Sequence, residues 1–326
     1  AHQHANSAQW FTDNGGPVYS PPGFGLDHEL DTTRNVLRQA ADDQTPRFIY
    51  LNLSPPHMPL MDAPERFLGM YRRDDVRPRD NLQPIGDEQA TREKLLTYLW
   101  DYRYYRDRLP YASALPEGCD ILELHRLYMG LTSWVDEALG RVLDTIDETG
   151  IADRTHVVFT SDHGENLGSH GMMGKLSPNE EAYRIPMVWR GPGIAAGNVS
   201  DRVGSLVDLA PTLVDLASLT VPRHMQGKSL TSAFDATKTH REDADNVAFF
   251  ETLNHGVGVR SATHAVNLPW TQTPDPRRGV ASEPNWAFDL RDDPHQQNAP
   301  IPEDPTCQAL TKAARHWDNQ TKWLDG

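Results

Sequence analysis

The sequence has little cysteine and no long hydrophobic run. Cys119 and Cys307 are the only thiols in 326 residues, and neither belongs to a C-x-x-C pair, which excludes a zinc-ribbon or thioredoxin-like site. A disulfide between them and two free thiols both stay open. No apolar stretch approaches the length that crosses a bilayer. The first residues also lack the basic region and apolar stretch of a signal peptide. The compartment therefore stays open between the cytoplasm and the periplasm or exterior.

Positive charge is also scarce. The chain carries 31 Lys and Arg against 46 Asp and Glu, which gives a net charge of −15. Such an acidic surface argues against nucleic acid as a partner, because binding a phosphate backbone needs a basic face. The hydrophobic content of 38% and aromatic content of 8% are ordinary for a folded protein. A chain of this length can form one large domain, or one domain with a smaller lobe.

Strand and helix patterns alternate along the central part of the chain. The β-rich run "RFIYLNLS" at 47–54 predicts a strand, and the helical spacing of apolar residues over 122–146 predicts a helix that ends before Gly150. The apolar runs at 155–161 and 185–189 predict two further strands. This alternation indicates an α/β fold with a mostly parallel sheet sandwiched by helices.

The rest of the chain divides by pattern. A helix is expected at 203–219, whereas residues 61–118 have weak periodicity and indicate a long insertion. Short strands begin near residue 246 and are followed by a helix at about 305–318, which predicts a smaller α+β lobe. We therefore expect a catalytic domain at 1–245 and a C-terminal subdomain at 246–326.

Candidate functional residues follow the strand expected at 155–161. The text there reads "FTSDHGENLGSHGMMGK", so Asp162, His163 and Gly164 come directly after the apolar run, and Lys175 follows in a Gly-rich loop. Functional groups of open α/β sheets gather beyond the carboxyl ends of strands. A carboxylate beside an imidazole suits a divalent cation, and an ammonium group suits a tetrahedral anion. The residue types alone are equally compatible with a non-functional interpretation, in which the strand ends at the surface and Asp162 belongs to a helix-capping turn.

Several stretches together are more specific than this motif. The chain resembles the C-terminal part of the sulfatase family, in the alkaline phosphatase superfamily. The resemblance lies in five sequence segments that occur in the same order as in the family: "SPPHMPL", "SWVDEALGRVLDTIDETGIADRTHVVFTSDHGE", "EEAYRIPMVWRGPGI", "VSDRVGSLVDLAPTLVDLASL" and "FDLRDDPHQQNAP". The resemblance runs from about residue 47 to residue 300, with the unmatched insertion between. It implies an alkaline-phosphatase-like fold and hydrolysis of sulfuric esters.

The resemblance implies roles for four residues. Asp162 and His163 match the pair that ligates one divalent cation. Ca²⁺ is favoured, with Mn²⁺ or another transition metal as the alternative. Many members carry Asn where this chain has His163, and His occurs there both in sulfatases and in the related phosphonate and phosphodiester hydrolases, so the residue does not settle which metal binds. Lys175 matches a lysine that contacts the sulfate oxygens. His57 matches a histidine that contacts the sulfate and can protonate the leaving alcohol. Physically, cationic groups offset charge on the transferred group, and an imidazole can supply the proton.

One departure from the family pattern is serious. The family's nucleophile is a formylglycine made from a cysteine or serine in a C/S-x-P/A-x-R signature, and no such signature occurs here. Cys119 is followed by "DILEL" and Cys307 by "QALTK". The resemblance therefore implies that an N-terminal segment of the same enzyme supplies the nucleophile and further acidic metal ligands.

Three functions remain open. The first is a metal-dependent sulfatase acting on a small-molecule or carbohydrate sulfate ester. The second is a phosphonate monoester or phosphodiester hydrolase of the same superfamily, and the third is a non-catalytic binding or assembly protein. A homo-oligomer also stays open. The insertion and the C-terminal subdomain are the candidates for the substrate rim, because binding loops vary on a fixed scaffold.

Overall fold

The structure is a computed structural model that describes residues 6–7, 9–101, 114–240, 245–252, 255–271 and 279–321. The chain divides into two compact units: unit 1 comprises Ala1–Thr155 and Leu167–Met173, and unit 2 comprises His156–Asn166 and Gly174–Gly326. The expected boundary at residue 245 is a different division and stays a prediction. Residues 102–113 of the expected insertion lie outside the described residues.

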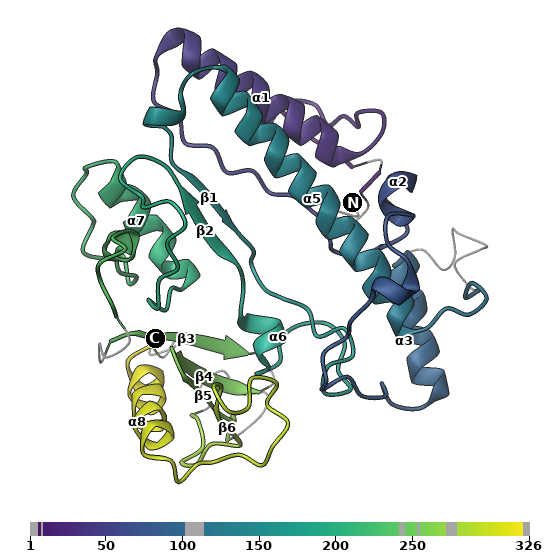
Figure 1. The fold of residues 1–326 in the computed structure, drawn as a ribbon, viewed down its shortest axis with the longest axis vertical. Helices are drawn as coiled ribbons and strands as arrows, with labels where there is room; N and C mark the ends of the chain where they lie inside the picture. The colour runs from purple at the N-terminus through teal and green to yellow at the C-terminus, as the bar shows by residue number, and fades with distance from the viewer. Residues whose placement is uncertain are drawn as a thin grey trace. The chain divides into compact units, whose positions relative to one another are not determined.

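Unit 1 is helical. Its two long helices, α1 and α5, pack side by side (Figure 1). The described elements in chain order are α1 (Gly25–Asp43), α2 (Glu65–Leu68), η1 (Arg73–Asp75), α3 (Glu88–Trp100), α5 (Ile121–Glu148) and η3 (Ala152–Arg154). The helix expected over 122–146 is therefore confirmed as α5, whereas α1 and α3 were not anticipated from the sequence.

Local signals explain where the helices of unit 1 begin and how they pack. The Asp120 carboxylate accepts the first free N–H groups of α5, and the Asp87 carboxylate accepts one from α3. Trp134 of α5 is 2% exposed and lies at the centre of the core. Its ring contacts Phe24 edge-on at 5.1 Å and stacks on Phe67 at 5.9 Å. Aromatic packing thus joins the segment before α1 and helix α2 to α5.

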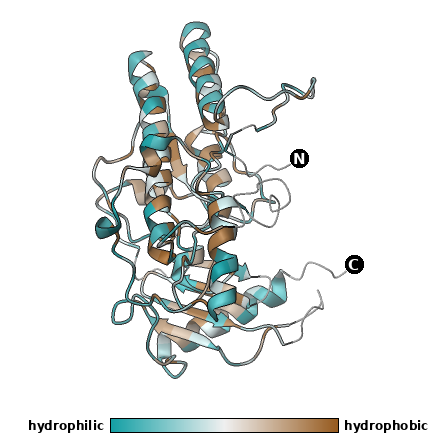
Figure 2. Cartoon of the chain, turned by 90° about the vertical axis from the view of Figure 1, so that its right-hand side faces the viewer, coloured by the Kyte–Doolittle hydropathy of each residue, from teal (hydrophilic) through white to brown (hydrophobic). Residues whose placement is uncertain are grey.

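The helices carry polar as well as apolar residues along their lengths (Figure 2). Among the residues that the structure describes, no helix combines the length and the hydropathy that a bilayer-spanning helix needs.

Unit 2 contains two sheets. The first pairs β1 (Val157–Thr160) with β2 (Met187–Arg190), and the second has the strand order β3-β4-β5-β6. The remaining described elements of unit 2 are α6 (Glu180–Tyr183), η4 (Leu206–Asp208), α7 (Leu209–Leu216), η5 (Thr231–Phe234), β3 (Val247–Thr252), β4 (Gly256–Ser261), β5 (His264–Leu268), β6 (Trp286–Asp289) and α8 (Pro305–Gln320).

The strand pairings differ from the expected parallel sheet. β1 and β2 run antiparallel, with Val157 opposite Arg190 and Thr160 opposite Met187, and all pairings of the second sheet are antiparallel as well. Residues 47–54 are not assigned as a strand, although their β-rich pattern predicts one. A strand requires a hydrogen-bonded neighbour, and the described pairings give this segment none. The expected parallel pairing is therefore absent from the described residues.

The C-terminal lobe has the expected α+β form. Helix α8 packs on β4 and β5, and its inward-facing residues join the strands in a buried core that includes Val257, Val266 and Leu310. The Trp317 ring stacks on Phe249 at a centroid distance of 5.5 Å. The antiparallel sheet thus buries one face under a single helix.

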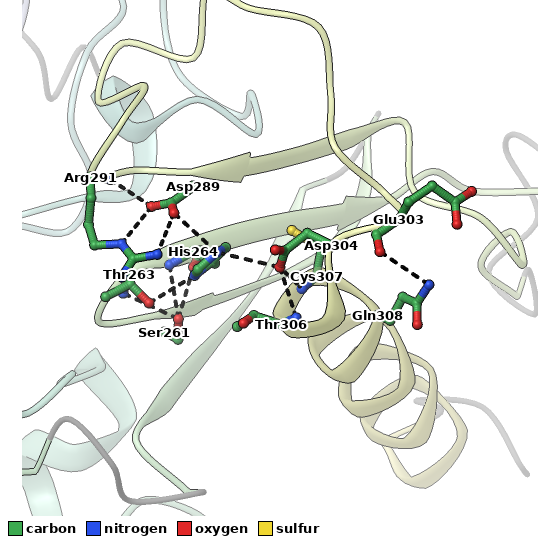
Figure 3. A network of polar contacts seen from close by, with 10 residues as sticks. All are labelled: Ser261, Thr263, His264, Asp289, Arg291, Glu303, Asp304, Thr306, Cys307 and Gln308. Atoms are coloured by element: carbon green, nitrogen blue, oxygen red, sulfur yellow. Dashed lines mark hydrogen bonds and ion pairs between the residues drawn. The ribbon is translucent and has the colours of Figure 1, made fainter.

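A polar network fixes α8 to this sheet (Figure 3). His264 of β5 is buried, and its Nε2 atom lies 3.6 Å from Asp289 Oδ2 and 3.5 Å from Asp304 Oδ1. Asp304 also caps α8 by accepting the backbone N–H groups of Thr306 and Cys307. Hydrogen bonds from Arg291, followed by the charge of His264, lower the pKa of Asp289 to about 2. The imidazole therefore connects two strands to the start of the helix.

Substituting Asp304 tests this connection. Asp304→Ala removes the cap of α8 together with the contact to His264, so the free energy of unfolding should fall by about 1–2 kcal/mol. Urea denaturation followed by circular dichroism measures this loss. Glu303→Ala is the matched control, because Glu303 is the residue before Asp304 and its side chain is exposed. The free energy of unfolding of this variant should stay within about 0.5 kcal/mol of that of the parent protein. Equal stability of the two variants would contradict the capping role.

Candidate functional site

Asp162 and His163 form a tight turn just after β1. The Asp162 Oδ1 atom accepts the His163 backbone N–H at 2.8 Å, and Oδ2 lies 3.3 Å from His163 Nε2. Ser161 Oγ donates to the His163 carbonyl at 2.9 Å, which holds the turn closed. The Asp162 side chain is 80% exposed and that of His163 35% exposed. A carboxylate oxygen and a ring nitrogen therefore lie together at an accessible position.

The tautomer of His163 follows from its backbone contact. Its Nδ1 atom lies 2.8 Å from the Gly164 carbonyl oxygen. Because a carbonyl only accepts, Nδ1 must carry the hydrogen, and in the neutral ring Nε2 then presents its lone pair. That lone pair is on the side of Asp162 Oδ2. A histidine whose Nδ1–H is held by a carbonyl is the arrangement that metal-binding imidazoles use.

Gly164 allows helix α6 to approach this turn. Its N–H donates to the Ala182 carbonyl at 2.8 Å. A Cβ atom at position 164 would lie 1.9 Å from the Glu181 carbonyl oxygen, far inside van der Waals contact. A larger residue would therefore push α6 and the Asp162–His163 turn apart.

Helix α6 is in turn held by the C-terminal lobe. Glu180, whose side chain is 4% exposed, accepts a hydrogen bond from Arg260 Nε of β4 at 3.0 Å. The Tyr183 ring stacks on Phe250 of β3 at 4.0 Å. Burial, followed by the Glu180 charge, raises the pKa of Tyr183 well above its usual value, so this phenol stays neutral. The four-stranded sheet thus provides a rigid support for the turn.

Lys175 is placed by a hydrogen-bonded junction that we call the Asn166 clamp, formed by Asn166, Glu165 and Gly174. The Asn166 backbone N–H and side-chain Nδ2 both donate to the Gly174 carbonyl, at 2.9 and 2.6 Å. Glu165 Oε1 accepts the Gly174 N–H at 2.6 Å. Ser177 and Asn179 each donate to Asn166 Oδ1 at 3.1 Å. The clamp fixes Gly174 next to Glu165 and Asn166. These two residues follow His163 closely, at two and three positions along the chain.

The Lys175 ammonium group follows this clamp directly. It is half-buried, and it makes no hydrogen bond or ion pair with the described residues. An ammonium group without a protein counter-ion can bind an anionic ligand. The clamp itself was not predicted from the sequence. The polar side chains in "GENLG" and the glycine before Lys175 were the available signals.

His57 belongs to unit 1, on a turn between two prolines. Its Nδ1 atom lies 2.6 Å from the Met58 carbonyl oxygen, and its backbone N–H donates to Ser54 at 3.0 Å. The turn is anchored where Leu60 N–H donates to the Tyr98 carbonyl in α3. Because Nδ1 faces a carbonyl, which only accepts, Nδ1 carries a hydrogen in this arrangement.

The donor set at the turn fits a divalent cation but does not complete its coordination. Two ligands about 2.2 Å from one cation and about 90° apart lie about 3.1 Å from each other, close to the 3.3 Å between Asp162 Oδ2 and His163 Nε2. In the described part of the chain, no group of three or more His, Cys, Asp or Glu side chains converges as a metal site. A cation here would need further ligands.

Comparison with protein families gives two matches. The sulfatase model matches residues 3–219, well over half of the 326 residues, and the model for the C-terminal part of N-sulphoglucosamine sulphohydrolase matches residues 168–271. The second match covers the Asn166 clamp from Gly174 onward, Lys175, and part of the C-terminal lobe.

Two curated relatives illustrate the range of the match. The chain is 28% identical over 315 residues to the multifunctional alkaline phosphatase superfamily protein PehA of Trinickia caryophylli, covering 91% of this chain and 59% of PehA. It is 30% identical over 213 residues to arylsulfatase K of Xenopus laevis, covering 64% of this chain and 39% of that protein. The chain thus spans about half the length of these relatives.

Solved structures show the same fold. BT4656, solved with its substrate D-glucosamine-2-N,6-O-disulfate, superposes with a TM-score of 0.75 at 23% identity, covering 99% of this chain and 75% of BT4656. The phosphonate monoester hydrolase SpPMH of Silicibacter pomeroyi gives a TM-score of 0.68 at 22% identity, covering 98% and 64% of the two chains. The expected alkaline-phosphatase-like fold is therefore confirmed, and with the family match over residues 3–219 this chain belongs to the sulfatase family of the alkaline phosphatase superfamily.

Proposed function

We propose that this chain provides the metal-binding and anion-binding part of a sulfatase that hydrolyses sulfate esters. The observation that carries the proposal is the turn after β1, where Asp162 Oδ2 and His163 Nε2 lie 3.3 Å apart and the Asn166 clamp sets Lys175 nearby in the chain. Two cation ligands and an unpaired ammonium group are what a negatively charged ester needs for charge stabilisation.

The metal proposed for Asp162 and His163 is one divalent cation, with Ca²⁺ first and Mn²⁺ as the alternative. When bound, such a cation polarises an oxygen of the ester and offsets the charge that develops on the transferred group. Asp162 suits either ion. An imidazole nitrogen favours transition metals, whereas Ca²⁺ prefers oxygen ligands, so His163 is the residue that influences which ion binds.

Lys175 and His57 are proposed to act on different parts of the substrate. The Lys175 ammonium would contact the non-bridging oxygens of the sulfate group. His57, as the imidazolium with Nδ1–H held by the Met58 carbonyl, would contact the same group through Nε2–H, donate that proton to the departing alcohol and be left as the neutral ring. The first role concerns charge on the transferred group, and the second concerns the leaving group.

Neither cysteine of the chain is suited to be the nucleophile. Burial, followed by the charges of Glu123 and Asp120, raises the pKa of the Cys119 thiol to about 11. Burial, followed by the charges of Asp304 and Asp289, raises that of Cys307 to about 12. A thiol attacks as the thiolate, which is scarce near neutral pH at such pKa values. Turnover would therefore depend on a formylglycine-bearing segment outside these 326 residues, which contain no matching signature.

The substrate class we propose is a sulfated carbohydrate. BT4656 binds a disulfated glucosamine, and N-acetylglucosamine-6-O-sulfatase of Bacteroides thetaiotaomicron is 36% identical over 137 residues, covering 40% of this chain and 25% of that protein. The second candidate function is phosphonate monoester or phosphodiester hydrolysis. The similarity of the chain to PehA and to the phosphonate monoester hydrolase SpPMH supports this second candidate function.

The metal ligands can be tested by isothermal titration of the assembled enzyme with Ca²⁺ and Mn²⁺. Asp162→Asn removes a charged donor, so both affinities should fall by about tenfold or more. His163→Asn replaces nitrogen by oxygen, so Mn²⁺ should weaken more than Ca²⁺. The control is Asp153→Asn, which changes an exposed carboxylate in η3. Unchanged affinity in Asp162→Asn would rule out this residue as a ligand.

The two substrate roles predict different responses to the leaving group. His57→Ala should slow aryl sulfates with poor leaving groups more than those with good ones, because a good leaving group needs no proton. Lys175→Ala should lower kcat/KM by about 10²-fold across the whole series, because it removes a charge that faces the transferred group. A leaving-group series for both variants of the assembled enzyme measures this. Uniform losses in His57→Ala would exclude its role as the acid.

The dependence on a nucleophile segment predicts how the chain behaves by itself. Residues 1–326 expressed alone should hydrolyse neither an aryl sulfate nor an aryl phosphodiester, and should bind divalent cations weakly. Adding a formylglycine-bearing N-terminal segment, in cis or as a second chain, should restore both properties. Metal-dependent turnover by residues 1–326 alone would show that the nucleophile lies within this chain.

A further inference from the structure

Buried oxygen atoms that accept no hydrogen bond from the described residues lie near the start of α1 in unit 1. Gln9 Oε1 and Glu29 Oε2 are both inaccessible to solvent and have no hydrogen-bond partner among the described residues. Leaving a buried acceptor without a donor costs about 1–3 kcal/mol. Asn6 Oδ1, in the same N-terminal segment, is a third such atom, so this region contains several buried acceptors that need an explanation.

Gln9 is seated directly on the first residue of α1. A Cβ atom at Gly25 would lie 1.7 Å from Gln9 Oε1, so the amide occupies the space that a side chain would fill. The adjoining segment is held there because Gly25 N–H donates to the Asn6 carbonyl at 2.8 Å. The absence of a side chain at position 25 is thus what admits the amide.

Glu29 lies one helical turn after Gly25 on the same face. Residues four apart on a helix have Cβ atoms about 5–6 Å from each other. Side chains on a helix lean toward its N-terminus, so the Glu29 carboxyl group extends over the turn that begins at Gly25. The Gln9 amide lies against the first residue of that turn. Both unpaired oxygens therefore belong to side chains that are directed at the first turn of α1.

We propose that Glu29 and Gln9 form a pH-sensitive clasp, in which the protonated Glu29 carboxyl group donates a hydrogen bond to Gln9 Oε1. One proton then satisfies both atoms and holds Asn6, Ser7 and Gln9 on the start of α1. Loss of that proton leaves a buried carboxylate, and the gain in hydration on exposing this charge opens the clasp. This inference is independent of the proposed hydrolase activity.

Within the described part of the chain, the charged groups around the clasp form no ion pair with Glu29. On α1 itself, Asp27 and Asp31 contact Arg141 of α5, and His28 bonds to Tyr19, which in turn donates to Asp13. Arg66 pairs with Glu137 of α5. From the loop that follows His57, Asp62 Oδ2 accepts the Ser7 N–H at 2.9 Å.

Burial alone raises the pKa of Glu29 to about 7. The native carboxyl group then binds its proton more tightly than the unfolded one, whose pKa is near 4.5. The stabilisation is therefore complete below about pH 4.5 and is lost as the pH rises through 7.

The clasp also contacts the loop that carries His57. Asn6 Nδ2 donates to the Asp62 carbonyl at 2.9 Å, alongside the Ser7 contact to the same residue. The N-terminal segment is thus fixed on one side by α1 and on the other by Asp62. Opening at α1 should release both contacts.

Hydrogen exchange of the full chain between pH 6 and 8.5, corrected for the intrinsic rates, tests the proposal. Exchange in peptides from residues 6–24 and 57–62 should rise by up to about tenfold per pH unit above 7, since opening is linked to one proton. Glu29→Gln supplies an N–H donor at every pH, so its protection should be independent of pH. Peptides from β4 and β5 are internal references.

Two further variants keep the test specific. Glu148→Gln, an exposed isosteric change at the end of α5, should follow the parent protein. Gln9→Ala removes the acceptor, so the segment should open at every pH. Coincident profiles for the parent protein and Glu29→Gln would overturn the proposal. Protection that follows added Na⁺ or Ca²⁺ instead of pH would also overturn it, because a cation would then join the two oxygens.

Discussion

The hydrogen bonds between Asn166 and Gly174 are the interaction on which the candidate site depends. Residues 167–173 pack in unit 1, whereas residues 156–166 and those from Gly174 onward belong to unit 2. The chain therefore leaves unit 2 just after the Asp162–His163 turn and returns just before Lys175. Asn166 is 1% exposed and forms hydrogen bonds through both the nitrogen and the oxygen of its amide. This one buried side chain therefore connects the segment before residue 167 to the segment after residue 173. Without it, the turn and Lys175 would be separated by a loop of independent conformation, with an ordering cost for every residue in it.

The turn itself obtains its geometry from backbone atoms. The Gly164 carbonyl orients the His163 ring, the His163 N–H orients Asp162, and the missing side chain at Gly164 lets α6 approach. Such contacts are shorter and stiffer than contacts between long side chains. They hold the two donors close together before any ligand binds, which lowers the ordering cost of binding. The support continues through Glu180 and Arg260 into the C-terminal sheet, so this lobe stabilises the site even where it supplies no ligand.

The sequence predicts those features that depend on local pattern. The regular apolar spacing of α5, the short strands that begin near residue 246 and the Asp-His pair after β1 could all be read directly. Helix α1 was missed because its buried positions, such as Leu26 and Leu30, are separated by charged residues that lower its mean hydropathy. The pairing of residues 47–54 depends on neighbours that local pattern does not reveal. The Asn166 clamp could not be inferred either, because it relies on contacts between residues that are polar and unremarkable in sequence.

If Asp162, His163 and Lys175 act as proposed, the charges at the site would suit both the sulfatases and the phosphonate hydrolase found among the relatives. A sulfate monoester, a phosphonate monoester and a phosphodiester each carry a single negative charge, so one cation and one ammonium group stabilise all three similarly. In the proposed site, the Asp162–His163 pair and Lys175 would therefore not by themselves select among them. Selection must come from groups that contact the rest of the substrate, where each buried hydrogen bond left unmade costs about 1–3 kcal/mol. For a sugar substrate those groups would be polar and would surround the ester. The residues that choose the substrate are therefore expected outside the Asp162–His163 turn and the Asn166 clamp.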